Sequence, residues 1–129
     1  MDICIAVAFS SALLLRVASP LTLSWQHSVE HFEIDEEWQA DAAGLTLREV
    51  RIHGLGAGVD LPDDAQSFDG GWRFTPKLAA QGRVVLANSR FGAGYRACWA
   101  GQCAALADLV GGVDRPLVMT SCEGDPAAP

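Results

Sequence analysis

The clearest hydrophobic pattern in the chain is a strict alternation over residues 21–30. The odd positions carry Leu21, Leu23, Trp25, His27 and Val29, while the even positions between them are polar. A period of two residues is typical of a β-strand with one buried face. His27 lies in the apolar phase, which leaves two interpretations: a hydrogen-bonded core histidine, or the floor of a site.

A second alternating segment covers residues 31–40. Its apolar side chains share one phase, and Glu36 falls in that phase with them. We therefore predict a strand on which Glu36 points inward, close enough to His27 to share a site. The alternative is a Glu36 at the edge of the sheet that reaches solvent.

Further short strands are expected over residues 45–53, 71–76, 83–89, 95–99 and 117–121, and the only helical composition is at residues 104–110. In residues 45–53 the apolar phase switches from odd to even, which predicts a bulge near Glu49. Residues 83–89 are apolar in both phases, as in a strand covered on both faces. The predicted fold is all-β: a small sandwich or barrel of short antiparallel strands with one short helix.

The first 19 residues are predicted to form an export signal or an N-terminal anchor. The run from Asp2 to Leu15 is apolar over the length of a signal-peptide core and too short for a comfortable membrane span. A buried first strand is the alternative. Residues 20–122 are then a single all-β domain and residues 123–129 a flexible tail, with the protein periplasmic or anchored to the membrane and facing the periplasm.

Charge excludes some classes of partner. The net charge is −7, and the nine Lys and Arg residues are scattered along the chain. Nucleic acids and anionic membranes are bound by concentrated basic patches, so neither is an expected partner. With half of its residues hydrophobic, the chain is expected to fold around a core.

Four cysteines suggest an oxidised protein. Cys98 and Cys103 enclose four residues that include Gly101, a spacing that fits a hairpin closed by a disulfide. Half a zinc site is the competing interpretation, but no second ligand pair follows at zinc spacing, so no metal is predicted. Cys4 is interpreted as a small apolar residue, and Cys122 as a free thiol or an alternative disulfide partner.

The glycine run Gly54, Gly56 and Gly58 superficially suggests a phosphate-binding loop. The residues after it include Asp60 and cannot begin the helix that such a loop requires. We therefore expect a turn or a close approach of the backbone, and no cofactor.

Several of these motifs, taken in order, resemble a known bacterial family. The motifs are Leu23-Ser24-Trp25, His27-Ser28-Val29-Glu30, Glu36 with Trp38, the glycine run, the segment around Trp72, Leu86-Ala87-Asn88-Ser89, and Cys98-Trp99 with Gly101 and Cys103. In order and spacing they resemble the family called domain of unknown function 1850. Its members are typically small exported proteins encoded beside tripartite ATP-independent periplasmic (TRAP) transporters that use a TAXI solute-binding protein.

The resemblance implies a periplasmic accessory or binding protein of solute uptake, with TRAP membrane subunits or the TAXI solute-binding protein as partners. The residues expected to line its polar pocket or docking surface are His27, Ser28, Glu30, Glu36, Gly54, Gly56 and Gly58.

Two alternatives remain open. One is a small hydrolase in which His27 is the general base for Ser28 or Ser89, although neighbouring strand residues point to opposite faces, which disfavours Ser28. The other is a structural or interaction domain without a small-molecule site. Because no nucleophile elbow or paired-carboxylate motif is present, we predict no catalytic residues and favour a protein that is not an enzyme.

Overall fold

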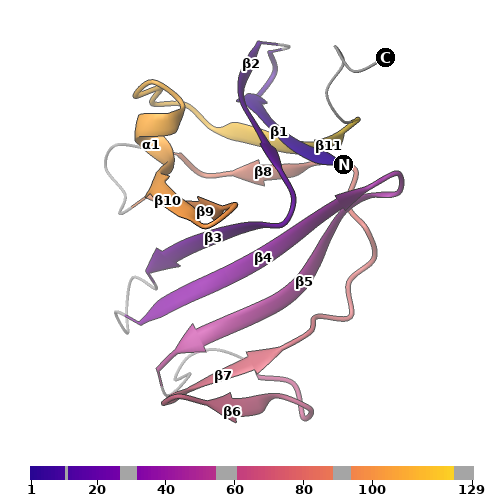
Figure 1. Cartoon of the computed structure of the whole chain (residues 1–129), viewed down its shortest axis with the longest axis vertical. Coiled ribbons are helices and arrows are strands. Elements are labelled where there is room, and N and C mark those ends of the chain that lie inside the picture. Colours follow the sequence, from indigo (N-terminus) through magenta and orange to yellow (C-terminus); the bar gives the residue numbers. More distant parts are fainter. Residues whose placement is uncertain (11, 27–31, 55–60, 89–93, 124–129) are drawn as a thin grey trace.

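A computed structural model describes residues 1–10, 12–26, 32–54, 61–88 and 94–123 of the chain. It contains two antiparallel sheets (Figure 1). The smaller sheet has the strand order β2 (Leu13–Ala18), β1 (Asp2–Val7), β11 (Leu117–Cys122) and β8 (Val84–Leu86). The larger sheet has the order β10 (Gln102–Ala105), β9 (Arg96–Trp99), β3 (Leu21–Gln26), β4 (Glu33–Asp41), β5 (Gly44–His53), β7 (Gly71–Phe74) and β6 (Gln66–Phe68).

The all-β prediction is confirmed, and of its two forms the structure has the sandwich. The described strands form two separate sheets that do not close into a barrel. In Figure 1 the smaller sheet lies at the top, while β6 and β7 mark the opposite end of the larger sheet. Among the described residues the one helix is α1 (Leu106–Leu109), which follows β10.

Two clusters of buried side chains form the core. The main cluster joins the two sheets and includes the fully buried Ile3, Leu23 and Met119. The second cluster comprises Phe32, Ile34, Val50 and Ile52, all contributed by β4, β5 and the residue that precedes β4.

The predicted alternation of the central strands is also confirmed. In β3, Leu21 and Leu23 are buried on the inner face, and Trp25 follows them in the same phase. The register pairs Glu37 with Glu49 but Trp38 with Leu47, so one extra residue of β5 forms a bulge. This bulge lies next to Glu49, where the switch of phase predicted it.

Two expectations about local structure are wrong. The helix was expected over residues 104–110, but Ala104 and Ala105 pair with β9, and only four residues remain for α1. Ladder hydrogen bonds to a neighbouring strand outweigh the propensity of a segment too short to be a stable helix alone. Residues 83–89 were expected to be covered on both faces, but β8 is the edge strand of its sheet and Val85 is 58% exposed.

The N-terminal segment forms the strands β1 and β2, the arrangement retained above as the buried-strand alternative. Ile3 and Ile5 of β1 are completely buried, and β1 lies between β2 and β11. Use of the same residues as an export signal stays a prediction. Within the described part of the chain, no helix has the length and apolar character needed to span a membrane.

A disulfide between Cys4 and Cys122 closes the smaller sheet, so the interpretations of Cys4 as a simple apolar residue and of Cys122 as a free thiol are wrong. Cys4 opposes Thr120 and Cys122 opposes Asp2, which makes the two cysteines diagonal neighbours on one face. Their Cα atoms are 6.0 Å apart, within the range that a disulfide bridges. Their separation of 118 positions in the sequence hides this proximity.

Candidate functional site

Glu36 lies on the inner face of the larger sheet, where the sequence placed it. It is opposite Leu23 of β3 and Val50 of β5, so it stands in a row of otherwise apolar side chains. Leu23 belongs to the main core cluster and Val50 to the second. The half-buried carboxyl of Glu36 therefore occupies the boundary between the two clusters.

The neighbours of this carboxyl are aromatic. Burial raises the pKa of Glu36 above the usual 4.5, and the indole N–H groups of Trp38 and Trp25, which favour the ionised form, offset only part of the rise. Burial and the nearby charge of Glu36 both raise the pKa of Tyr95. Trp38 Nε1 lies near Glu36 but does not reach hydrogen-bond geometry, and it is buried without a partner among the described residues.

An opening of about 400 Å³ lies where β3 and the segment leading into β9 diverge; Trp25, the diagonal neighbour of Glu36, lines it, but Glu36 itself does not. The last residue pair between these strands is Ser24 with Arg96. Beyond that pair the two segments separate, and we call the resulting space the β3–β9 opening. It is lined by Ser24, Trp25, Gln26, Glu33, Gly94, Tyr95, Arg96 and Ala105. Trp25 and Tyr95 thus both line the opening and interact with Glu36.

The outer face of the same sheet carries a separate polar network centred on Asp35. The hydroxyl of Ser24 donates to Oδ1 of Asp35 at 2.7 Å, and His53 Nε2 lies 2.7 Å from Oδ2. Arg51 is 3.6 Å from the same carboxylate. Burial raises the pKa of Asp35, but the hydrogen bonds from His53 and Ser24 and the charges of His53 and Arg51 outweigh it, so the pKa lies below 3.8.

This network contains the residue types of a hydrolytic triad in an unsuitable order. In a triad the imidazole lies between the hydroxyl and the carboxylate, so that it can take the proton of the hydroxyl. Here the carboxylate of Asp35 lies between Ser24 and His53. Ser24 is only 4% exposed and its hydroxyl is already bonded, so we assign the network to stabilisation of the sheet.

No sequence motif singled out Asp35 or His53. The available signal was the register of the hairpin: once the bulge near Glu49 is placed, Asp35 opposes Arg51 and becomes a diagonal neighbour of His53. Across the described part of the chain, no three His, Cys, Asp or Glu side chains are grouped closely enough to hold a metal ion.

Of the predicted site residues, the structure describes Glu36 and Gly54. Gly54 follows the end of β5, four residues beyond the partner of Glu36, which is roughly 13 Å along an extended strand. A Cβ atom at Gly54 would meet the Cβ of Phe32 at 2.8 Å, so this glycine permits close packing. His27, Ser28, Glu30, Gly56 and Gly58 lie outside the described residues, as does Ser89 of the hydrolase alternative.

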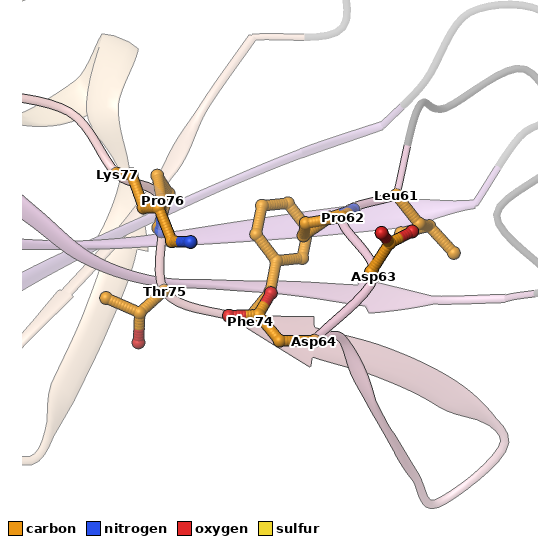
Figure 2. Close-up of a pocket in the computed structure, with 8 residues that line it drawn as sticks. All are labelled: Leu61, Pro62, Asp63, Asp64, Phe74, Thr75, Pro76 and Lys77. Atoms are coloured by element: carbon orange, nitrogen blue, oxygen red, sulfur yellow. The ribbon is translucent and has the colours of Figure 1, made fainter.

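A second opening, of about 510 Å³, lies where the chain enters β6 and leaves β7 (Figure 2). Phe74 forms part of its wall, with Lys77 and Asp63 on either side of the ring in this view. Lys77, Asp63 and Asp64 are all exposed. Water screens such charges strongly, so this opening offers weaker electrostatic recognition than the half-buried Glu36.

The predicted disulfide between Cys98 and Cys103 is confirmed. The two residues are direct partners in the β9–β10 hairpin, with Cα atoms 4.1 Å apart. Ala100 and Gly101 both have positive φ angles, 49° and 78°, as a two-residue hairpin turn requires. Together with the Cys4–Cys122 bond, this disulfide indicates a protein that matures in an oxidising, extracellular-type compartment.

Comparison with known proteins gives one match. The model of the family described as a domain of unknown function (DUF1850) matches residues 21–106, which include β3 to β10 and the first residue of α1. No curated protein and no solved structure matches the chain significantly. The match covers two thirds of the sequence and contains Glu36, the β3–β9 opening and the Cys98–Cys103 hairpin, and the chain therefore belongs to the DUF1850 family.

Proposed function

We propose that this protein is a periplasmic accessory of TRAP-type solute uptake and that it binds a small solute at the β3–β9 opening. The observation that supports binding most strongly is Glu36, a half-buried carboxyl among aromatic side chains, two of which, Trp25 and Tyr95, line an opening of about 400 Å³. Small-molecule sites typically combine such apolar walls with a few polar groups whose pKa values are perturbed.

Burial of this carboxyl is difficult to explain by stability alone. An ionised group loses hydration when it is buried, and at neutral pH this cost opposes folding. The described residues include no ion pair to Glu36, whereas the more exposed Glu33 has Arg96 at 3.1 Å. A carboxyl that is unfavourable for folding and contacts side chains that line an opening is typical of a residue retained for binding.

The periplasmic location and the transporter partner are supported by different observations. Two disulfides favour the periplasm over the cytoplasm. The association with TRAP membrane subunits and a TAXI solute-binding protein rests on the family resemblance stated above, and it stays a proposal.

The experiment compares solute uptake in cells that carry the wild-type protein, Glu36→Gln or Glu37→Gln. Glu37 is the matched control because it is the next residue of β4, points to the outer face and pairs with Arg48 and Arg51. We expect Glu36→Gln to reduce uptake at unchanged protein level, Glu37→Gln to leave uptake intact, and the wild-type protein to co-purify with a transporter component. Normal uptake in a strain that lacks the protein would contradict the proposal.

A further inference from the structure

The Cys98–Cys103 disulfide lies on the outer face of the larger sheet, next to an open edge. Cys98 is opposite Thr22, which belongs to the phase of β3 that points away from the core. Cys103 lies on β10, the last strand of the sheet, so no described strand pairs with its other side. Cys98 is half-buried and Cys103 is exposed. Solvent therefore reaches this disulfide more freely at Cys103 than at Cys98.

An opening of about 380 Å³ lies beside the bond. It is lined by Pro20, Thr22 and the six hairpin residues 98–103, and thus by both cysteines. Thiol–disulfide exchange depends on whether the attacking thiol can reach a sulfur. The opening gives a molecule that carries a thiol the space to do so.

The direction of the bond decides which sulfur is open to attack. A thiolate attacks a disulfide sulfur from the side opposite the sulfur that leaves. Cys98 and Cys103 are direct partners on neighbouring strands, so the bond runs across the sheet. An attack on Cys103 comes from beyond the edge of β10, where no described strand lies. An attack on Cys98 comes from above β3, over Thr22.

The Cys4–Cys122 disulfide has no such open side. It joins two interior strands, because β1 lies between β2 and β11, and β11 lies between β1 and β8. Both of its cysteines are half-buried. Arg16 is opposite Cys4, and Asp2 is opposite Cys122. The ion pair of Arg16 with Asp2, at 2.8 Å, therefore flanks this bond, and the two disulfides differ in access.

Opening of the Cys98–Cys103 bond leaves its hairpin in place. Four residue pairs hold β9 to β10, and β9 also pairs with β3. The bond joins residues only five positions apart, so its loss releases little chain entropy. The two thiols thus stay side by side in the folded protein, where the disulfide can form again.

We propose that the Cys98–Cys103 disulfide is a site of reversible thiol–disulfide exchange, and that an external thiol attacks it at Cys103 Sγ. The attacking thiolate forms a bond to Cys103 Sγ, the bond between the two cysteines breaks, and Cys98 leaves as a thiolate that takes up a proton. A second external thiolate then attacks the sulfur of the first and releases Cys103, which is protonated in turn. Two external thiols are oxidised to one disulfide, and the protein disulfide is reduced to two thiols. This site is independent of the proposed solute binding at the β3–β9 opening.

The test incubates the native, oxidised protein with reduced glutathione, traps free thiols with N-ethylmaleimide and maps the products by peptide mass spectrometry. We expect glutathione on Cys103 and the maleimide on Cys98, and the Cys98–Cys103 bond should open at least about tenfold faster than the Cys4–Cys122 bond. The rate should rise in proportion to the glutathione concentration, as direct attack on the folded protein requires. Glutathione chiefly on Cys98, equal rates at the two bonds, or a rate that does not depend on glutathione would overturn the proposal.

A second probe identifies the kind of thiol. Reduced thioredoxin, a protein dithiol, replaces glutathione in the same experiment. Faster opening with glutathione assigns a small thiol to the site, and faster opening with thioredoxin assigns a protein dithiol. Failure of both probes to open the Cys98–Cys103 bond in the folded protein would overturn the proposal.

Two matched variants test the difference between the sulfurs. Cys98→Ser and Cys103→Ser each remove the same bond and leave one thiol on the same hairpin. With oxidised glutathione, the Cys103 thiol of the first variant should react at least about tenfold faster than the Cys98 thiol of the second. Equal rates in two folded variants would contradict the attack from the sheet edge. The mapping on the wild-type protein needs neither variant, so it decides the question even where a variant does not fold.

Discussion

Removing the two disulfides separately should have very different effects on stability, because they close loops of very different length. The Cys4–Cys122 bond joins residues 118 apart in sequence, and the Cys98–Cys103 bond joins residues five apart. In the chain-entropy model a cross-link stabilises the protein by restricting the unfolded chain, and the effect grows with the logarithm of loop length. The model gives about 5 kcal/mol for the long loop and about 2 kcal/mol for the short one.

The corresponding variants are Cys4→Ser with Cys122→Ser, and Cys98→Ser with Cys103→Ser. Each makes the same chemical change twice, so the difference between them isolates the effect of the loop. We expect the first variant to be less stable than the second by about 3 kcal/mol, or roughly 10 °C in Tm.

The assay is urea unfolding followed by tryptophan fluorescence, with a thermal scan as a second measurement. The first variant also tests whether β1 belongs to the folded protein, because Cys4 lies in that strand. Two results would refute the assignment of residues 2–7 to the smaller sheet. One is equal stability of the two variants, and the other is a variant without the Cys4–Cys122 bond that is as stable as the wild-type protein.

Three further predictions concern single side chains. Because the pKa of Glu36 is raised in the folded protein, its protonation favours folding below pH 4.5, and this stabilisation is lost as the pH rises. Glu36→Gln should therefore increase the free energy of unfolding at pH 7, measured in urea. The increase should be smaller near pH 4. The effect of pH on the contribution of Asp35 is the opposite, because its lowered pKa gives stability that is present at neutral pH and is lost as the pH falls below 3.8. Asp35→Asn should lower the free energy of unfolding by about 2 kcal/mol at pH 7 and by less in acid. A loss that does not change with pH would contradict this prediction. Gly54→Ala should cost about 1–3 kcal/mol by its clash with Phe32, whereas Gly82→Ala, which meets no atom within 4 Å, should be nearly neutral in the same assay.

Local periodicity predicted the part of the fold that local geometry controls. Alternation in β3 and β4 depends only on neighbouring residues, so it placed Trp25 and Trp38 on one face and identified Glu36 as their inward-facing polar neighbour. The switch of phase in β5 likewise located the bulge, because a bulge exchanges the two faces of a strand.

Features that depend on distant segments were not predicted. A short apolar run such as residues 2–7 is equally consistent with the core of an export signal and with a buried strand. Only its pairing with β11 identifies it as a strand of the folded protein. The Cys4–Cys122 bond follows from that pairing. Val85 is exposed because its side chain points to the opposite face of β8 from the buried Leu86, and which face is covered depends on the rest of the fold.

In the candidate site, too, residues set by local alternation were predicted and residues brought in by distant segments were not. Glu36 was found from the sequence, but Tyr95 comes to the β3–β9 opening only because β9 pairs with β3, whose partners are 72 to 76 positions away in the sequence. His53 reaches Asp35 through the β4–β5 register.

Glu36 is a half-buried acid on the inner face of the larger sheet, and no described residue forms an ion pair with it. The measurement that tests this placement most directly is an NMR titration of the side-chain carboxyl carbon of Glu36. We expect a pKa above 4.5, because burial disfavours the charged form of the carboxyl. A pKa at or below 4.5 would contradict the inward placement of Glu36.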